Sequence, residues 1–332
     1  MTLDLALRQV LARYPKPLSP LTVPQCLGNA GGLSGACFWR YDSAMGPLFV
    51  KAWPEGFSDW PRLVRIDRWL SMAGGLSFLA IPFASHDRRS FVHVSGRYWQ
   101  ISPWLRGSAD LEEPPSSSHV QAGFQGLAWL HRHWSNASES RNGASPGLER
   151  RFRETDELIR GGFDRLERAV FGSCQSVNRE LAFRWLKLAR RIAPGLVENL
   201  KVARQTTTRL QPCIRDARRD HFLFEGDDLT GIVDFGAMDL ESVAGDLARL
   251  AGDWLIEDRS GSLMRLALDV YQEIHPLDAV ERGLMARFAE ATALLAPGHW
   301  VEWHFVEGRK FEDPQAVHRG LSRGLRRLEA YA

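Results

Sequence analysis

Residues 213–236 read CIRDARRDHFLFEGDDLTGIVDFG, and this stretch carries the pattern that decides the fold. Two short apolar runs, 222–224 and 229–233, flank the turn sequence EGDD, which predicts a β-hairpin. Asp216 precedes the hairpin, and Asp234 closes its second strand. Because a hairpin returns the chain to where it began, both carboxylates can face one cavity, where one could orient a hydroxyl and the other hold Mg²⁺. Two turn-forming aspartates are the alternative interpretation.

A glycine-rich segment and a lysine precede this stretch in the chain. Residues 28–35 read GNAGGLSG between two predicted strands, and such a loop lets backbone N–H groups cradle phosphates. Its candidate contacts are Gly31, Gly32 and Ser34. Lys51 follows about 16 residues later on the next predicted strand, and its ammonium group suits phosphate oxygens. A plain glycine turn and a strand-edge lysine with a solvated tip are the alternatives.

Taken in chain order, the glycine loop, the strand lysine, the loop aspartate and the hairpin ending in DFG resemble the aminoglycoside phosphotransferase/choline kinase family. The resemblance covers about residues 25 to 255. The separation of Asp216 from Asp234, 18 positions (234 − 216), fits that family. Residues 99–107 (WQISPWLRG) resemble its interlobe hinge, and residues 239–250 resemble the helix after its metal-binding segment.

This resemblance implies a two-lobed, protein-kinase-like α+β fold with a small strand-rich lobe and a larger helical lobe. ATP, or GTP, would bind with Mg²⁺ and donate a phosphoryl group to a small-molecule hydroxyl. We therefore expect a nucleotide-binding lobe with its hinge over residues 1–107. The catalytic loop and the acceptor site would belong to a helical lobe over residues 108–332, because a polar Pro/Ser stretch follows Gly107.

The catalytic loop departs from the family motif HGDxxxxN. Arg215 stands where the motif has glycine, Asp216 keeps the place of the aspartate, and His221 replaces the asparagine. The resemblance makes Arg215, Asp216 and His221 the catalytic candidates. Asp234 and His221 are the metal candidates. Because imidazole suits transition metals better than Mg²⁺, Asp220 could supply an oxygen instead, or Asp234 could hold the only ion.

The glutamate that pairs with the strand lysine in this family is also missing. The predicted helix at 59–73 has an apolar face that includes Leu63 and Leu70, and Asp67 shares that face. A charge on an apolar face needs a partner, and Lys51 would serve, so Asp67 is a candidate of the nucleotide site. An Asp67 side chain that points outward at the edge of this face is an equal alternative.

Local patterns outside the motifs predict the remaining elements. Alternating apolar residues predict five strands of the first lobe, at 38–41, 48–53, 81–84, 91–94 and 98–102. Residues 135–147 (SNASESRNGASPG) predict a mobile loop. His131 and His133 are two positions apart on a helix, which points their rings apart and favours structural or surface roles over a zinc site.

The composition is that of an ordinary globular protein, with 44% hydrophobic and 25% charged residues. A net charge of +2 does not favour a nucleic-acid or membrane partner. The N-terminus lacks the apolar core of a signal peptide, and no apolar run approaches the roughly 20 residues needed to span a bilayer. We therefore expect a cytoplasmic protein with free cysteines; the oligomeric state stays open.

Two functions remain in competition. An ATP-dependent phosphotransferase is favoured by Lys51, Asp216 and Asp234. A nucleotide-binding pseudokinase or regulatory module with little or no transfer activity is favoured by the replacements at Arg215 and His221. Nucleic-acid binding is disfavoured because the arginines are spread along helices, often beside acids.

The acceptor is left open, and a cationic alcohol is one hypothesis. Aromatic rings beside carboxylates can hold a cation, and the C-terminal helices carry both kinds of side chain. These residues are Trp254, Glu257, Asp258, Trp300, Glu302 and Trp303. Tryptophans that pack the core are the alternative.

Overall fold

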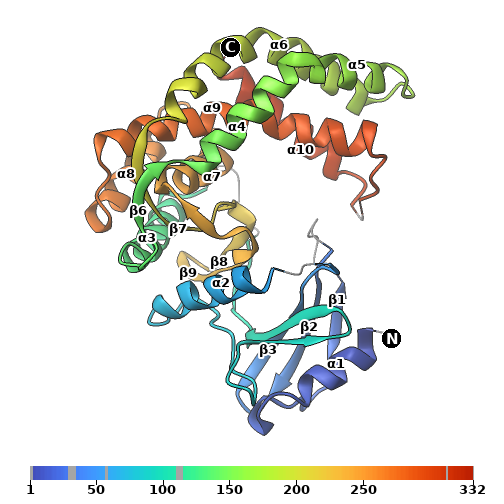
Figure 1. The fold of residues 1–332 in the computed structure, drawn as a ribbon, viewed down its shortest axis with the longest axis vertical. Helices are drawn as coiled ribbons and strands as arrows, with labels where there is room; N and C mark the ends of the chain where they lie inside the picture. Colours follow the sequence, from blue (N-terminus) through green and yellow to red (C-terminus); the bar gives the residue numbers. More distant parts are fainter. Residues whose placement is uncertain (1–2, 29–34, 57–58, 110–114, 312, 332) are drawn as a thin grey trace. The chain divides into compact units, whose positions relative to one another are not determined.

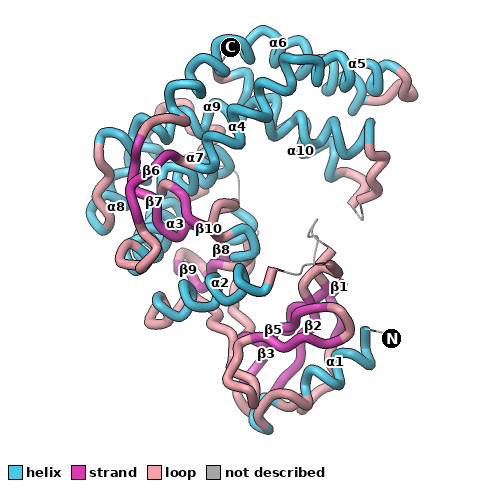
Figure 2. Tube along the Cα trace, viewed as in Figure 1, coloured by secondary structure: helices cyan, strands magenta, loops and turns pink. Residues whose placement is uncertain are grey.

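The computed structural model describes residues 3–28, 35–56, 59–109, 115–311 and 313–331. Its internal contacts divide the chain into two compact units (Figure 1). The first unit comprises Met1–Ala109 and His221–Asp234, and the second comprises Asp110–Asp220 and Phe235–Ala332. Strands gather in the first unit and helices in the second, as Figure 2 shows, so the expected α+β class is confirmed.

The first unit is built on a five-stranded antiparallel sheet with the order β1-β2-β3-β5-β4. The strands are β1 (Gln25–Gly28), β2 (Cys37–Ser43), β3 (Gly46–Ala52), β4 (Phe91–Val94) and β5 (Arg97–Pro103). Alternate residues such as Trp39, Val50 and Trp99 are buried, as expected where one sheet face covers a core. Helix α1 (Leu3–Leu11) contributes Leu7 and Val10 to the same core.

The pattern at 81–84 was wrongly predicted to be a strand. The segment is a loop in which the N–H of Phe83 donates one hydrogen bond to Ile101. Pro82 lacks an N–H and cannot continue a ladder. The predicted helix is present as α2 (Trp60–Met72), and the side chain of Asp59 caps it by accepting a hydrogen bond from the N–H of Arg62.

The predicted hairpin is formed by β8 (Phe222–Glu225) and β9 (Asp228–Ile232). Its contacts group it with the first unit, although the sequence analysis assigned it to the helical part. The reason is backbone pairing, because Ile232 bridges to Leu79 and Phe224 bridges to Ser108. The chain therefore passes from the second unit into the hairpin at residues 220–221 and leaves it at 234–235.

The second unit is mainly helical. Its helices are α3 (Ser117–Trp134), α4 (Pro146–Glu157), α5 (Phe163–Phe171), α6 (Val177–Ala203), α7 (Val243–Trp254), α8 (Ser262–Ile274), α9 (Ala279–Val301) and α10 (Ala316–Glu329). A small sheet of β6 (Arg141–Ala144), β7 (Thr207–Cys213) and β10 (Asp239–Glu241) has the order β10-β7-β6. Trp185, Phe288 and Leu294 are buried in one hydrophobic core of this unit.

Two local predictions in this unit need correction. Residues 135–147 are not one loop, because β6 pairs with β7 and α4 starts at Pro146 after its cap, Ser145. The side chains of β6 are mostly exposed, so no apolar alternation marks the strand. Residues 239–250 begin with β10 before α7 starts. Among the residues that the structure describes, no helix is both long and apolar enough to cross a bilayer.

Candidate functional site

In the first unit, the strand lysine and the aspartate after the hairpin form an ion pair. Lys51 lies on β3, and its Nζ is 3.3 Å from Oδ1 of Asp234 and 4.2 Å from the ring centre of Trp53. The Lys51 side chain is 17% exposed and that of Asp234 is 52% exposed, so solutes can reach the carboxylate. Asp234 has a φ of 60°, a strained value for a residue with a Cβ, and such strain is often found at functional sites.

His221 stands beside the same carboxylate. Its Nε2 lies 3.8 Å from Oδ2 of Asp234, and its ring is nearly buried. The N–H of Val233 donates to the carbonyl of His221, which joins the two ends of the hairpin. The structure thus brings together three predicted site residues, Lys51, His221 and Asp234. The carboxylate offers the oxygen ligands that Mg²⁺ prefers, whereas the imidazole does not.

Asp67 does not pair with Lys51. Within the described part of the chain, the charge partner of Lys51 is Asp234, and Asp67 lies beside Ser90. Burial raises the pKa of Asp67, and the Ser90 hydroxyl lowers it in part. The carboxylate shares the apolar face of α2 as expected, but Asp234 follows a strand paired into this unit and offsets the lysine charge instead.

The glycine-loop candidates Gly31, Gly32 and Ser34 lie outside the described residues. The glycines on either side of this segment are described. Gly28 and Gly35 have φ values of 63° and 76°, which residues with a Cβ rarely adopt.

In the second unit, the catalytic-loop candidates Arg215 and Asp216 follow β7, and Asp246 on α7 holds the backbone at the start of this loop. Asp246 is fully buried, and its carboxylate accepts hydrogen bonds from the N–H groups of Ile214 (2.7 Å) and Arg215 (2.6 Å). Arg215 has a φ of 66°, a conformation that costs about 1–3 kcal/mol and needs support from its surroundings. The Arg215 side chain pairs with Asp239 at 3.5 Å. Asp246 thus fixes the backbone just before Asp216.

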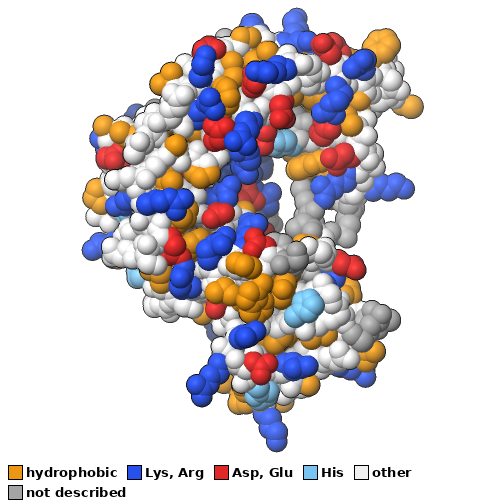
Figure 3. Space-filling view, viewed as in Figure 1, with side chains coloured by type: hydrophobic (Ala, Val, Ile, Leu, Met, Phe, Trp, Pro, Cys, Tyr) orange, Lys and Arg blue, Asp and Glu red, His pale blue; other side chains and the backbone are white. Residues whose placement is uncertain are grey.

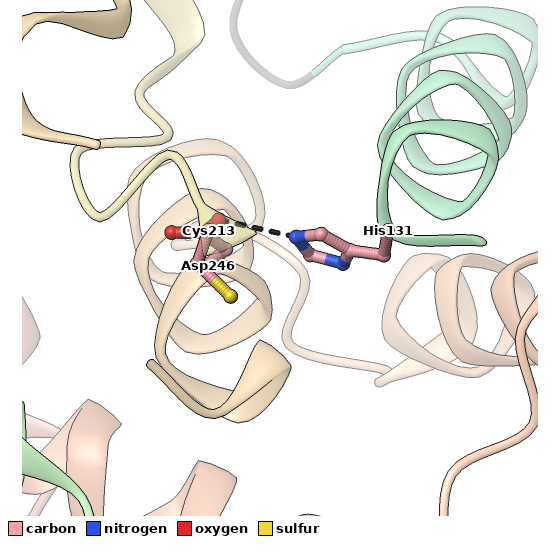
Figure 4. Close-up of side chains that lie close together, drawn as sticks. All are labelled: His131, Cys213 and Asp246. Atoms are coloured by element: carbon pink, nitrogen blue, oxygen red, sulfur yellow. Dashed lines mark hydrogen bonds and ion pairs between the residues drawn. The ribbon is translucent and has the colours of Figure 1, made fainter. Parts of the chain in front are cut away.

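A buried polar network supports Asp246. Nε2 of His131 lies 3.1 Å from Oδ2 of Asp246, and Nδ1 of His131 lies 2.7 Å from the Tyr271 hydroxyl. Figure 4 shows the His131 ring directed at Asp246, and Cys213 lies beside Asp246. The three could form a metal site, but both ring nitrogens are hydrogen-bonded and the Cys213 thiol donates to the carbonyl of Glu241. Burial, then Asp246, raises the pKa of this thiol, which disfavours a thiolate ligand.

Sequence reasoning did not single out Asp246, and it did not identify the partners of His131. His131 was assigned a structural or surface role; it is fully buried and connects α3 to α7 and α8. The sequence signal for Asp246 was the segment GDLA after the hairpin, which was used only to predict a helix.

Asp216 lies between two arginines of its own unit. Arg249 on α7 lies 3.2 Å from its Oδ1, and Arg218 lies 3.6 Å from its Oδ2. The Asp216 side chain is 36% exposed. A carboxylate in this setting can orient a hydroxyl and accept its proton.

The residues suggested for a cationic acceptor have other partners. Trp254 is buried and stacks on Phe124, and Trp300 packs edge-on against Trp303. Glu302 makes a bidentate pair with Arg165 at 2.6 and 2.7 Å. The packing alternative therefore describes these tryptophans better than a shared cation site does.

Charged side chains of both signs are interspersed on the face shown in Figure 3, and no extended basic surface stands out there. This distribution agrees with the low net charge of +2.

Comparison with known proteins gives three kinds of match. A sequence model of the phosphotransferase enzyme family matches residues 25–284. A homoserine kinase of Janthinobacterium sp. (strain Marseille) is 28% identical over 246 residues, which cover 72% of this chain and 68% of that protein. The fold is similar to an aminoglycoside phosphotransferase from Alicyclobacillus acidocaldarius (TM-score 0.64, 14% identity, 98% of this chain and 93% of that one). It is also similar to the amicoumacin kinase hAmiN in complex with AMP-PNP, Ca²⁺ and Ami (TM-score 0.66, 12% identity, 99% and 93%).

Proposed function

The chain belongs to the phosphotransferase enzyme family, and from this premise we propose that it transfers the γ-phosphoryl group of ATP to a hydroxyl of a small molecule. The pair formed by Lys51 and Asp234 carries the proposal, because it combines a phosphate-binding cation with a metal-binding carboxylate. Two similar proteins support it: one is named a homoserine kinase, and the other is a kinase in complex with AMP-PNP and Ca²⁺.

In the proposed reaction the acceptor oxygen forms a bond to the γ-phosphorus, and the bond from that phosphorus to the β–γ bridging oxygen breaks. The products are the phosphorylated acceptor and ADP. The hydroxyl proton passes to the carboxylate of Asp216 and then to solvent. Asp216 acts as the base, and Asp246 holds the backbone that presents it.

The first unit would bind the nucleotide. Lys51 would contact phosphate oxygens, and the backbone around Gly31, Gly32 and Ser34 would cover the phosphates. The same contacts would serve GTP, because contacts to phosphates do not distinguish adenine from guanine. Mg²⁺, when bound to Asp234, would neutralise charge on the phosphates. His221 is nearly buried beside that carboxylate, and we assign it the role of orienting Asp234 rather than of binding the ion.

A pseudokinase is the second candidate function. One observation favours it: both oxygens of Asp216 already lie near arginines, at 3.2 and 3.6 Å, and these arginines compete with an acceptor hydroxyl for the carboxylate. Such a protein would bind the nucleotide through Lys51 and Asp234 but transfer no phosphoryl group.

The nucleotide site is tested by thermal denaturation. ATP with Mg²⁺ should raise the melting temperature of the full chain, because a ligand that binds only the folded state stabilises it. Asp234→Ala should lose the Mg²⁺-dependent part of this rise. Asp228→Ala, which removes an exposed carboxylate of the same hairpin, is the control and should keep it. An equal Mg²⁺-dependent rise in the wild type and in Asp234→Ala would contradict the metal assignment.

A further inference from the structure

The second unit has a pocket where α3 packs against α8 and β7 (Figure 1). Its volume is about 540 Å³. Its lining consists of Arg132 and Ser135 at the end of α3, Arg209 on β7, and residues 273–276 at the end of α8. Arg209 stands four residues before the end of β7 at Cys213, about 13 Å along the strand, and the candidate catalytic loop begins only after that end. The pocket is therefore a separate feature from the catalytic loop.

Two arginines line this pocket, and neither forms an ion pair among the residues that the structure describes. Arg209 is half-buried; its Nη2 lies 2.8 Å from Nε2 of His275, and its Nε is buried without a hydrogen-bond partner in the described part of the chain. Arg132 is exposed, and its guanidinium group lies 5.3 Å from the ring centre of Trp129. A guanidinium group that stacks on a ring keeps the N–H donors of its edge for a ligand.

The hydrogen bond between Arg209 and His275 determines the charge of the pocket wall. A guanidinium group has donors only, so Nε2 of His275 accepts and the imidazole is neutral. The ring is nearly buried, and burial, followed by His131, Arg209 and Arg132, lowers its pKa to about 3. The positive charge at the pocket therefore comes from the two arginines, and both lie close enough to His275 to affect its protonation.

The carboxylates near the pocket do not pair with these arginines. Glu281 on α9 is buried, and its Oε2 accepts a hydrogen bond from the N–H of Asp278. Burial raises the pKa of Glu281, and the Asp278 backbone and Arg209 lower it only in part. Glu273 lines the pocket with an exposed side chain and forms no ion pair among the described residues. The pocket therefore presents two arginine cations and one exposed carboxylate, which gives it a net positive charge.

We propose that this pocket binds a small organic oxyanion, a molecule that carries a phosphate or a carboxylate group. The planar guanidinium groups of Arg132 and Arg209 match the oxygens of either group. Ile274 and Pro276 supply apolar wall, and the volume suits a molecule larger than inorganic phosphate. Glu273 opposes the bound anion and lowers its affinity. This site is additional to the proposed phosphoryl transfer and does not depend on it.

Binding is measured by NMR at His275, because its ring nitrogen contacts Arg209 and senses an anion there. The full chain carries ¹⁵N in its histidine rings, and His275→Gln assigns the signal. Inorganic phosphate, phenyl phosphate, acetate and benzoate are titrated at constant ionic strength without nucleotide or metal, and methylammonium is the cationic probe. We expect a saturable shift of the His275 signal with the oxyanions and none with methylammonium. The order of the phosphate and carboxylate probes in affinity then identifies the anionic group.

Charge variants test whether the lining residues bind the anion. Arg132→Gln changes an exposed side chain and should raise the Kd of the tightest oxyanion about fivefold or more. Glu273→Gln removes the opposing carboxylate and should lower this Kd about two- to fivefold. Arg265→Gln removes an exposed arginine near the other end of α8, and as the matched control it should leave the Kd unchanged. Lys51→Met, in the first unit, should also leave it unchanged. Circular dichroism of each variant establishes that it folds.

The inference is wrong if no oxyanion shifts the His275 signal saturably, or if Arg132→Gln binds the anion as tightly as the wild type does. Weaker anion binding in Glu273→Gln, or preferential binding of methylammonium, would assign the pocket to a ligand with a positive charge and overturn it as well. A shift that Lys51→Met abolishes and Arg132→Gln keeps would assign the anion to the nucleotide site instead. The proposed phosphoryl transfer is tested separately, by the Mg²⁺-dependent change in melting temperature of Asp234→Ala.

Discussion

The ion pair of the first unit and the polar network of the second unit are held in opposite ways. Lys51 and Asp234 meet at 3.3 Å with side chains 17% and 52% exposed. His131 and Asp246 meet at 3.1 Å with both side chains fully buried, and Asp246 also accepts two backbone N–H groups. The first pair is open to ligands, whereas the second is closed to them and determines the course of the loop that carries Asp216.

This difference separates two tasks. A residue that binds a nucleotide or a metal must be reachable, so its own partners are few and exchangeable. A residue that fixes a loop must be buried, because low polarity and good geometry make its hydrogen bonds hard to replace. We therefore expect substitutions in the network to affect stability and substitutions in the exposed pair to affect ligand binding.

The largest expected effect on stability follows the loss of Asp246. Asp246→Ala leaves the N–H groups of Ile214 and Arg215 buried without an acceptor, at about 1–3 kcal/mol each, so we expect a loss of about 2–6 kcal/mol in unfolding free energy. Lys51→Met removes a partly exposed ion pair and should cost about 0–1 kcal/mol. Urea unfolding followed by circular dichroism measures both.

Asp246→Asn sharpens this test, because the amide keeps one acceptor oxygen and the volume of the side chain. Its cost should lie between those of Asp246→Ala and Lys51→Met. Equal losses for Asp246→Ala and Lys51→Met would contradict the contrast between the buried network and the exposed pair.

A smaller effect is expected from the pH dependence of stability at His275, whose ring centre lies 6.2 Å from that of His131. Burial, then His131 and Arg209, lowers the pKa of His275 from 6.5 to about 3. As the pH falls below about 6.5, the unfolded chain binds a proton at this position before the folded chain does, so stability declines by up to about 1.4 kcal/mol per pH unit until about pH 3. His275→Gln should make this acid limb shallower in urea titrations between pH 7 and 5. If the unfolding free energy of His275→Gln fell with pH as steeply as that of the wild type, groups other than His275 would cause the loss of stability in acid.

The sequence was most informative where side-chain pattern and backbone pairing coincide. The hairpin at 222–232 and the strand at 91–94 have apolar runs bounded by turns, and both are present. The segment at 81–84 has a strand-like composition, but Pro82 cannot join a ladder. Strand β6 is defined by its pairing with β7 alone, so its exposed residues gave no signal.

In the candidate site, too, the sequence identified residues from local patterns but not their partners from distant segments. Lys51, His221 and Asp234 were found from motif order, and their proximity depends on pairing between distant segments of the first unit. Asp67 was expected to pair with Lys51 because it shares an apolar helix face, but such a face does not specify the partner. Asp246 and His131 are 115 positions apart, and no local pattern reports their hydrogen bond.

The most direct test of the account is the stoichiometry of phosphoryl transfer. The full chain is incubated with ATP, Mg²⁺ and a panel of small hydroxylated compounds, and ADP and phosphorylated product are quantified by mass spectrometry. We predict equal amounts of ADP and product with the wild type. Asp216→Asn should lower kcat by about 10²–10⁴-fold and leave nucleotide affinity nearly unchanged, because the amide cannot accept the hydroxyl proton. Nucleotide binding without any phosphorylated product in the wild type, or undiminished turnover in Asp216→Asn, would contradict the account.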